Sequence, residues 1–189
     1  MGQPVLKNPL DLWIYQQILL DQRPNVLIET GTHVGGSALY FSSIGSGGRL
    51  ELDVVTIDFN PKFAYDPSQY RIHSIRGIST AGETVARVRQ FVERRAEEGD
   101  TRVMVVLDSD HSMNNVSKEL ELYAGFVTPG QYLVVEDTNV NGHPVYADHG
   151  PGPFEAVEAF LPRHPEFQRD PGCERFLFTQ NPGGWLKRQ

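Results

Sequence analysis

The chain has little that would cross-link it or anchor it in a membrane. Its 189 residues include one cysteine, Cys173, which excludes an internal disulfide and a zinc site built from several cysteines. No apolar run approaches the length of a membrane-spanning helix, and no signal peptide precedes the first expected helix. These absences predict a cytoplasmic protein without a membrane partner.

Basic residues are also the minority. Lysine and arginine number 17 against 24 aspartates and glutamates, which gives a net charge of −7. The densest basic stretch, 87–95, is followed and interrupted by glutamates, a pattern typical of a solvated helix face. This excludes a basic nucleic-acid-binding surface. No internal repeat or low-complexity segment is present, and the length predicts one domain spanning residues 1–189.

Short β-branched runs alternate with amphipathic stretches along the chain. Strands are expected at 26–28, 54–57, 71–76, 105–107 and 133–135. Helices are expected from Pro9 after the capping residue Asn8, after Ser37, after a capping box of Thr80 and Glu83, and around 116–123 and 154–160. Residues 175–179 and 185–187 predict a closing β-hairpin. The sequence therefore indicates an α/β fold with a mostly parallel sheet, right-handed crossovers and a C-terminal antiparallel hairpin.

Two of these strands end abruptly in acids. Asp108 follows the run 105–107, and Glu136 with Asp137 follows the run 133–135. Because the carboxyl ends of parallel strands meet at one edge of a sheet, the three carboxylates are expected to lie close together. Like charges held together require a positive charge among them, and a hard divalent cation is the usual one.

His111 lies three residues beyond Asp108, within reach of whatever such a cation holds. Simpler roles exist for these residues. Asp108 and Asp110 are also suited to capping the helix that begins near Ser112, and His111 taken alone is typical of a hydrogen-bonded loop histidine. We rank Asp110 behind Asp108 as a ligand and give it an outer role.

The loop after the first strand indicates what else binds at this edge. Its glycines are spaced G-x-x-x-G-G from Gly31, which is not the dinucleotide fingerprint. Glu29 at the strand end would repel a pyrophosphate but suits an ammonium group. Asp58 ends the second strand, where nucleotide-binding sheets place an acid on a ribose diol. Either acid alone would be an ordinary loop cap; together they indicate S-adenosylmethionine, a nucleoside that carries an ammonium and no phosphate.

The chain resembles the cephalosporin hydroxylase family within the class I S-adenosylmethionine-dependent methyltransferases. Despite its name, that family includes metal-dependent sugar O-methyltransferases. The matching segments are 29–31 with 35–37, Asp58, 107–111, 135–138, 150–153 and 181–188.

The resemblance implies a Rossmann-like fold with a seven-stranded sheet and helices on both faces. It implies cofactor contacts at Glu29, Thr30, Gly31, Gly35, Gly36, Ser37, Asp58, Gly77, Ile78, Ser79 and Asp108. It implies Mg²⁺ or another divalent cation on Asp108, Glu136 and Asp137, with His111 as general base. Catechol-type relatives carry a lysine at the position of His111, so the histidine favours the sugar-type branch.

The expected reaction is methylation of a hydroxyl on a small molecule with vicinal hydroxyls, such as a sugar or a glycosylated natural product. Two vicinal oxygens chelating a cation lower the pKa of the attacking hydroxyl. His149 and Tyr146, on the long loop 139–153, are candidates for acceptor contacts. An iron-dependent hydroxylase is less favoured, because it needs two histidines and one carboxylate. A non-catalytic S-adenosylmethionine-binding protein and a homo-oligomer remain open.

Overall fold

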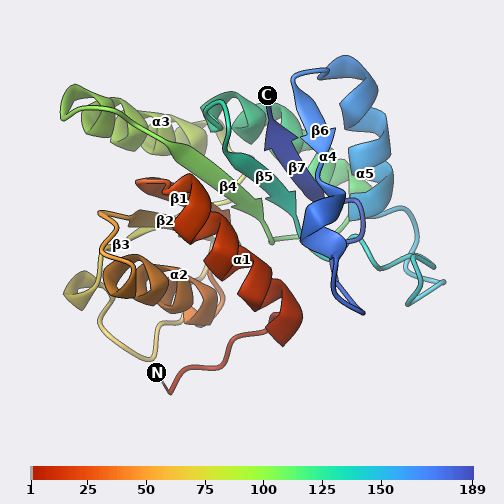
Figure 1. The fold of residues 1–189 in the computed structure, drawn as a ribbon, viewed down its shortest axis with the longest axis horizontal. Coiled ribbons are helices and arrows are strands. Elements are labelled where there is room, and N and C mark those ends of the chain that lie inside the picture. The colour runs from red at the N-terminus through yellow and green to blue at the C-terminus, as the bar shows by residue number, and fades with distance from the viewer. Residues whose placement is uncertain (1) are drawn as a thin grey trace.

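The computed structural model describes residues 2–189 and contains one seven-stranded sheet (Figure 1). The strand order is β3-β2-β1-β4-β5-β7-β6. Strands β1 to β5 are parallel, whereas β7 runs antiparallel to both β5 and β6. The predicted fold, a mostly parallel α/β sheet of the class I methyltransferase type with antiparallel C-terminal strands, is confirmed.

The bounds of the elements follow the predicted alternation. The strands are β1 (Val26–Thr30), β2 (Asp53–Asp58), β3 (Ile72–Arg76), β4 (Val103–Leu107), β5 (Tyr132–Val135), β6 (Phe167–Arg169) and β7 (Trp185–Arg188). The α-helices are α1 (Pro9–Gln22), α2 (Gly36–Gly47), α3 (Gly82–Glu97), α4 (Met113–Tyr123) and α5 (Pro153–Phe160). Short 3₁₀ helices lie at Pro67–Gln69, Ala124–Phe126, Leu161–Arg163 and Pro171–Glu174.

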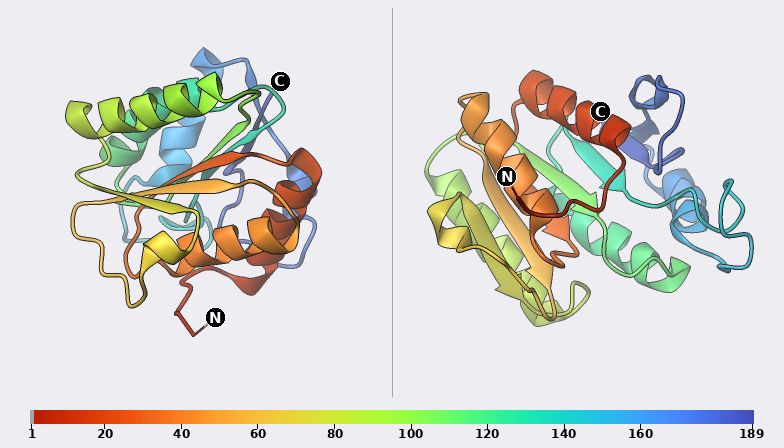
Figure 2. Two further views of the ribbon diagram at one scale, coloured as in Figure 1. Left: turned by 90° about the vertical axis from the view of Figure 1, so that its left-hand side faces the viewer. Right: turned by 90° about the horizontal axis from the view of Figure 1, so that it is seen from below.

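Helices cover both faces of the sheet (Figure 2). α1 and α2 pack on one face, and α3, α4 and α5 on the other. Side chains of β1 alternate between the two cores, since Val26 and Ile28 face α3–α5 while Leu27 faces α1 and α2. All five residues of β1 are buried, as expected for the centre of a sheet covered on both sides.

The start of α1 matches its prediction. The Asn8 side chain accepts a hydrogen bond from Leu10 N, and Pro9 occupies the first helical position. The capping box predicted for α3 is wrong. That helix starts at Gly82, and its N-cap residue Ala81 makes no side-chain capping bond.

The first strand of the predicted C-terminal hairpin is also wrong. Residues 175–179 form no strand, and Leu177 is fully exposed. β7 pairs instead with β6, which lies several residues earlier in the chain, and the segment 170–184 connects the two. The antiparallel pair exists, but a different segment supplies its first strand.

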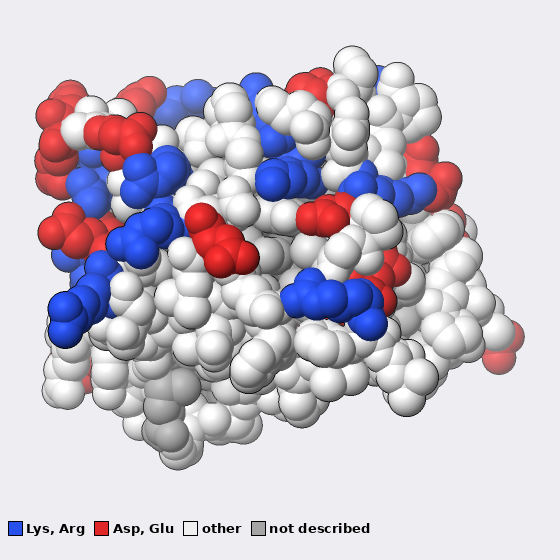
Figure 3. Space-filling view, in the orientation of Figure 1, with Lys and Arg blue, Asp and Glu red and all other residues white. Residues whose placement is uncertain are grey.

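Charged side chains of both signs are mixed on the face of the molecule that Figure 3 shows. On the face in Figure 3, lysine and arginine side chains alternate with aspartate and glutamate rather than forming one basic area. Within residues 2–189, no helix is both long and apolar enough to cross a membrane.

A cluster of charged side chains links β2, β3 and α3 at the amino end of β2, away from the cavity end of the sheet. Asp53, the first residue of β2, accepts hydrogen bonds from Arg71 at 2.7 Å, His73 at 2.9 Å and Arg95 at 3.0 Å. Burial favours the neutral carboxyl, but these three partners outweigh it and lower the pKa of Asp53 to about 2. Since that pKa lies below the ordinary value of 3.8, the carboxylate stabilises the folded state above pH 4.

Replacing Asp53 with asparagine is expected to reduce the free energy of unfolding by about 2 kcal/mol at pH 7. The difference from wild type should shrink as the pH falls below 4 and be largely gone near pH 2, where the wild-type carboxylate is itself about half protonated. Urea denaturation at a series of pH values measures it. The exposed Asp21 supplies a matched control, Asp21→Asn, with little effect at any pH. A loss for Asp53→Asn that stayed constant between pH 7 and pH 3 would contradict the prediction.

Candidate active site

A cavity of about 520 Å³ opens at the carboxyl ends of β1, β2 and β4. This volume lies in the range of small-molecule and cofactor sites. Most of the predicted cofactor-contact residues line it: Gly31, Gly36, Ser37, Asp58, Gly77, Ile78, Ser79 and Asp108. Glu29, Thr30 and Gly35 do not line it, so their predicted contacts with the cofactor are not visible in the cavity itself.

The glycines of the first loop are required by protein neighbours. A Cβ on Gly31 would lie 1.7 Å from the carbonyl oxygen of Asp108, and Gly31 has a φ of +88°. A Cβ on Gly36 would lie 1.9 Å from the carbonyl oxygen of Pro4. Gly31 therefore lets the ends of β1 and β4 approach each other, and Gly36 lets the N-terminal segment cross the start of α2.

Glu29 lies behind the cavity wall with no exposed surface. Its Oε2 accepts a hydrogen bond from Thr56 Oγ1 at 2.7 Å, while its Oε1 has no hydrogen-bond partner among the described residues. Burial raises the pKa of this carboxyl, and Lys7, Ser37 and Thr56 oppose the rise. A buried acceptor without a donor fits the ammonium group predicted for this position.

Asp58 lies at the cavity wall with a fixed orientation. Its Oδ2 accepts from His33 N at 2.9 Å and its Oδ1 from Asn60 N at 2.8 Å, which leaves lone pairs on both oxygens for a diol. Phe59 and Ile78 line the same wall and are 71% and 62% exposed. Two exposed apolar side chains beside Asp58 fit a flat base. Phe59 was not predicted; its position directly after an acidic strand end is the signal that would have indicated it.

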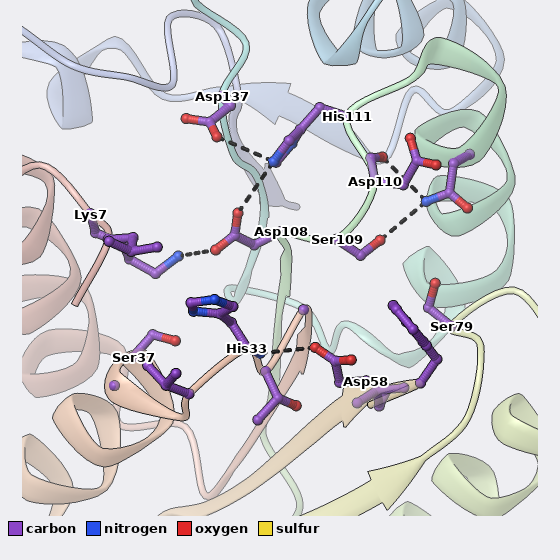
Figure 4. A pocket seen from close by; sticks show the side chains of 18 of the residues that line it. Lys7, His33, Ser37, Asp58, Ser79, Asp108, Ser109, Asp110, His111 and Asp137 are labelled. Atoms are coloured by element: carbon purple, nitrogen blue, oxygen red, sulfur yellow. Dashed lines mark hydrogen bonds and ion pairs between the residues drawn. The ribbon is translucent and has the colours of Figure 1, made fainter. Parts of the chain in front are cut away.

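Asp108, His111 and Asp137 form an acidic cluster at one end of the cavity (Figure 4). One ligand atom from each residue lies within 4.8 Å of the others. The His111 Nε2 is 3.3 Å from Asp137 Oδ2 and 4.0 Å from Asp108 Oδ1. Burial raises the pKa of Asp137, and the adjacent His111 opposes that rise. Two carboxylates and one imidazole aimed at one point suit a divalent cation or a proton-transfer site.

Sequence reasoning missed Lys7, which lies beside this cluster. Its Nζ is 2.7 Å from Asp108 Oδ2 and 2.9 Å from Glu136 Oε1, and its side chain is 2% exposed. Burial disfavours the ammonium, but the carboxylates of Asp108, Glu136 and Glu29 outweigh burial and raise the pKa of Lys7. The positive charge expected among the acids is therefore supplied in part by the chain itself. No local signal indicates this, because Lys7 precedes Asp108 by 101 residues.

Glu136 differs from its predicted partners. It lies outside the cluster of Asp108, His111 and Asp137, it is buried, and it does not line the cavity. Its Oε1 accepts hydrogen bonds from both Lys7 Nζ and the Tyr15 hydroxyl. Direct binding of a metal by Glu136 stays a prediction, and it would have to use the other oxygen, Oε2.

The remaining candidates have simpler surroundings. Asp110 Oδ1 accepts from Ser112 N at 2.8 Å, and this bond lowers the pKa of Asp110. The capping role considered for Asp108 and Asp110 is wrong, because Ser112 is the N-cap of α4 and its side chain accepts from Asn115 N. Tyr146 is 76% exposed on the loop after β5. His149 is also exposed on this loop, and its Nδ1 lies 3.1 Å from the carbonyl oxygen of Gly150.

Comparison with known proteins adds to this geometry. A family model described as Rhamnosyl O-methyltransferase/CmcI matches residues 1–189. Rhamnosyl O-methyltransferases of Mycobacterium tuberculosis are 39% identical over 190 residues, covering 100% of this chain and 77% of the relative. The Mycobacterium leprae protein of the same name is 38% identical, covering 100% of this chain and 82% of the relative.

Solved structures show the same fold. A CmcI structure with magnesium and S-adenosylmethionine superposes with a TM-score of 0.75 at 20% identity, covering 100% of this chain and 75% of the other. The MycE methyltransferase of mycinamycin biosynthesis, in complex with magnesium, S-adenosylhomocysteine and mycinamycin VI, has a TM-score of 0.56 at 20% identity. That match covers 77% of this chain and 40% of the other.

Proposed function

Because the chain belongs to the rhamnosyl O-methyltransferase/CmcI family, we propose that it methylates a sugar hydroxyl that has a neighbouring hydroxyl, using a divalent cation. Family membership confirms the predicted enzyme class, an S-adenosylmethionine-dependent O-methyltransferase. The sugar acceptor and the metal dependence are the proposed parts.

The observation that carries the proposal is the position of the acidic cluster. Asp108, His111 and Asp137 line the same cavity as Asp58 and Ser37, so the proposed metal end and the proposed cofactor end share one cavity. A methyl donor and an acceptor bound there would lie side by side, which is what an in-line transfer requires.

Each end has residues suited to its task. At the cofactor end, Glu29 would accept from the ammonium, Asp58 would bind the ribose diol, and Phe59 and Ile78 would enclose the base. Gly31 and Gly77 line this end of the cavity. A Cβ on Gly77 would lie 2.3 Å from Thr84 Oγ1, so a larger residue there would clash. Thr30 and Gly35 would act indirectly: Thr30 Oγ1 accepts from Asp108 N at 3.2 Å, and Gly35 O accepts from Tyr65.

At the acceptor end, Asp108 and Asp137 would hold Mg²⁺, with Glu136 as the third predicted acid. Vicinal oxygens of the acceptor would chelate a cation held there, which would lower the pKa of one hydroxyl, and S-adenosylmethionine would supply the methyl group. His111 would take the hydroxyl proton at Nε2, the atom that faces both carboxylates. Asp137 would then stabilise the imidazolium from 3.3 Å.

The names of the relatives support a sugar acceptor. The mycobacterial relatives are rhamnosyl O-methyltransferases, and rhamnose carries vicinal hydroxyls. The alternative of an iron-dependent hydroxylase has less support, since the cluster in residues 2–189 contains one histidine and two carboxylates. A protein that only binds the cofactor would have no need of His111 and Asp137 at the cavity.

The proposal is tested by incubating the protein with S-adenosylmethionine, Mg²⁺ and a simple aryl rhamnoside. We expect formation of S-adenosylhomocysteine and a mono-O-methylated rhamnoside, and loss of both products when EDTA replaces Mg²⁺. The same rhamnoside with its vicinal hydroxyls blocked as an acetonide is the matched control. Cofactor binding without turnover across a panel of diol-bearing glycosides would favour the binding-only alternative, and equal turnover in EDTA would remove the metal from the proposal.

Replacing Asp58 with alanine is expected to weaken S-adenosylhomocysteine binding by about 10- to 100-fold, because hydrogen bonds to a charged acceptor contribute about 1.5–3 kcal/mol each. Turnover at saturating cofactor should change much less than KM. Isothermal titration calorimetry measures the affinity. Asp66→Ala, at an exposed aspartate that likewise accepts a backbone N–H two residues on, is the control. Unchanged affinity in Asp58→Ala would contradict the placement of the ribose.

A further inference from the structure

We propose that Lys7 determines which divalent cation the acidic cluster accepts, by occupying one carboxylate oxygen on Asp108 and one on Glu136. The inference rests on the proposed metal site and adds a selectivity-determining residue to it. Lys7 is a positioning residue, since it acts through the two carboxylates.

The contacts of Lys7 divide each carboxylate. Lys7 Nζ forms an ion pair with Asp108 Oδ2 at 2.7 Å. The other oxygen, Asp108 Oδ1, faces His111 and lies 4.0 Å from His111 Nε2. Figure 4 shows Lys7 and His111 approaching Asp108 from different sides. On Glu136, Lys7 Nζ takes Oε1 at 2.9 Å and the Tyr15 hydroxyl donates to the same atom. Each acid is therefore left with one oxygen that Lys7 does not bind.

The ammonium is held in this place by its surroundings. Asn8, the next residue, caps α1 and donates its backbone N–H to Gln180 Oε1 at 3.0 Å. On the other side, the carbonyl of Pro4 lies in the space that the missing side chain of Gly36 leaves. With its backbone fixed at both ends and its side chain 2% exposed, Lys7 cannot turn away into solvent without unpairing a buried charge.

The number of carboxylate oxygens that Lys7 leaves free affects which cation can bind. Ca²⁺ takes six to eight oxygens and readily uses a carboxylate with both oxygens at once, whereas Mg²⁺ takes single oxygens at the corners of an octahedron. Because Lys7 binds one oxygen of Asp108 and one of Glu136, it would oppose two-oxygen binding of a cation by either acid, and this would disfavour Ca²⁺ relative to Mg²⁺.

The charges agree with one divalent ion. Glu29 also acts on Lys7 but is the carboxylate proposed to bind the ammonium of the cofactor. The other three acids, Asp108, Glu136 and Asp137, carry three negative charges when ionised, and the ammonium of Lys7 offsets one of them. The remaining two match a single Mg²⁺. Removing the ammonium would leave both a surplus negative charge and two carboxylates free to bind through both oxygens, and each change favours the larger ion with its higher coordination number.

The test measures metal affinity in the full chain with S-adenosylhomocysteine present. Bound Mn²⁺ is followed by electron paramagnetic resonance, and Mg²⁺ and Ca²⁺ are compared as competitors. Wild type is expected to release Mn²⁺ to Mg²⁺ more readily than to Ca²⁺. Lys7→Met should shift the ratio of Ca²⁺ to Mg²⁺ affinities toward Ca²⁺ by about tenfold or more. Lys118→Met, at an exposed lysine of α4, makes the same change in net charge and should leave the ratio unchanged.

Lys7→Arg keeps the charge and is expected to retain the preference for Mg²⁺, which separates the effect of the ammonium from general damage to the fold. A ratio in Lys7→Met within about twofold of wild type would overturn the inference. So would a wild-type protein that prefers Ca²⁺, a measurement that needs no variant and decides the matter even where Lys7→Met does not fold. Failure of wild type to bind Mn²⁺ at all is a different outcome, because it removes the proposed metal site and the inference with it.

Discussion

Replacing His111 with alanine is expected to lower kcat by about 10²- to 10⁴-fold, the usual contribution of a general base, while leaving the affinity for S-adenosylhomocysteine unchanged. The reason is the placement of Nε2. It faces Asp137 Oδ2 at 3.3 Å and Asp108 Oδ1 at 4.0 Å, and His111 lies across the cavity from Asp58 (Figure 4). We therefore expect the side chain to take a proton from the acceptor and to make no contact with the cofactor.

His111→Gln separates proton transfer from positioning. Glutamine keeps a polar side chain near Asp137 but accepts no proton at neutral pH, so this variant should be as inactive as His111→Ala. Single-turnover kinetics and calorimetry with S-adenosylhomocysteine measure the two quantities. If His111→Gln turned over at a rate near that of wild type, His111 would be a structural residue and another group would have to be the base.

The fold and the proposed cofactor end were largely predictable, because both depend on local sequence signals. Buried parallel strands are rich in β-branched residues, so runs of such residues predict them. An acid directly after such a run indicates the carboxyl end of the strand, where ligands bind. Asp58 and Asp108 were therefore placed at the cavity by their position in the sequence alone. Phe59 directly follows Asp58, so the same argument could have placed it at the cavity.

Contacts between distant segments could not be predicted in this way. Lys7 meets Glu136 across 129 residues of sequence, and nothing around Lys7 distinguishes it from a solvated lysine. Because the sequence does not reveal this contact, the expected repulsion between Asp108 and Glu136 was assigned entirely to a bound metal. The structure places the ammonium of Lys7 between these two acids, so the acids alone overstate the negative charge that is available to bind a cation.

The C-terminal error has a similar origin. Residues 175–179 have the composition of a strand, but pairing is decided by which segment can lie beside β7 with its apolar side chains buried. Phe167 is buried in the core on β6, whereas Leu177 is fully exposed. Burial of one phenylalanine against α5 and β7 therefore outweighs the higher local β propensity of 175–179.

Replacing Asp137 with asparagine is expected to weaken Mn²⁺ binding by more than about 100-fold, since loss of outer partners alone costs about 10- to 100-fold in metal affinity. Turnover should fall with it. The substitution is well suited to the site because Asp137 has a φ of +54°, a conformation that asparagine adopts as readily as aspartate. Its backbone N–H donates to Asn181 Oδ1 at 2.9 Å, a bond that the substitution preserves. Any loss therefore reports the carboxylate oxygens and not a strained loop.

The matched control is Asp148→Asn, at an exposed aspartate in the loop after β5 that belongs to no cluster with His111. It makes the same change in net charge and should leave Mn²⁺ affinity within about twofold of wild type, because the charge of an exposed side chain is weakened by water and screened by salt, with a Debye length of about 8 Å at physiological ionic strength. Equal losses in both variants would show a general electrostatic effect. Retention of Mn²⁺ and full activity by Asp137→Asn would show that the cation, where one is bound, depends on Asp108 and Glu136 instead, and that Asp137 serves only to orient His111.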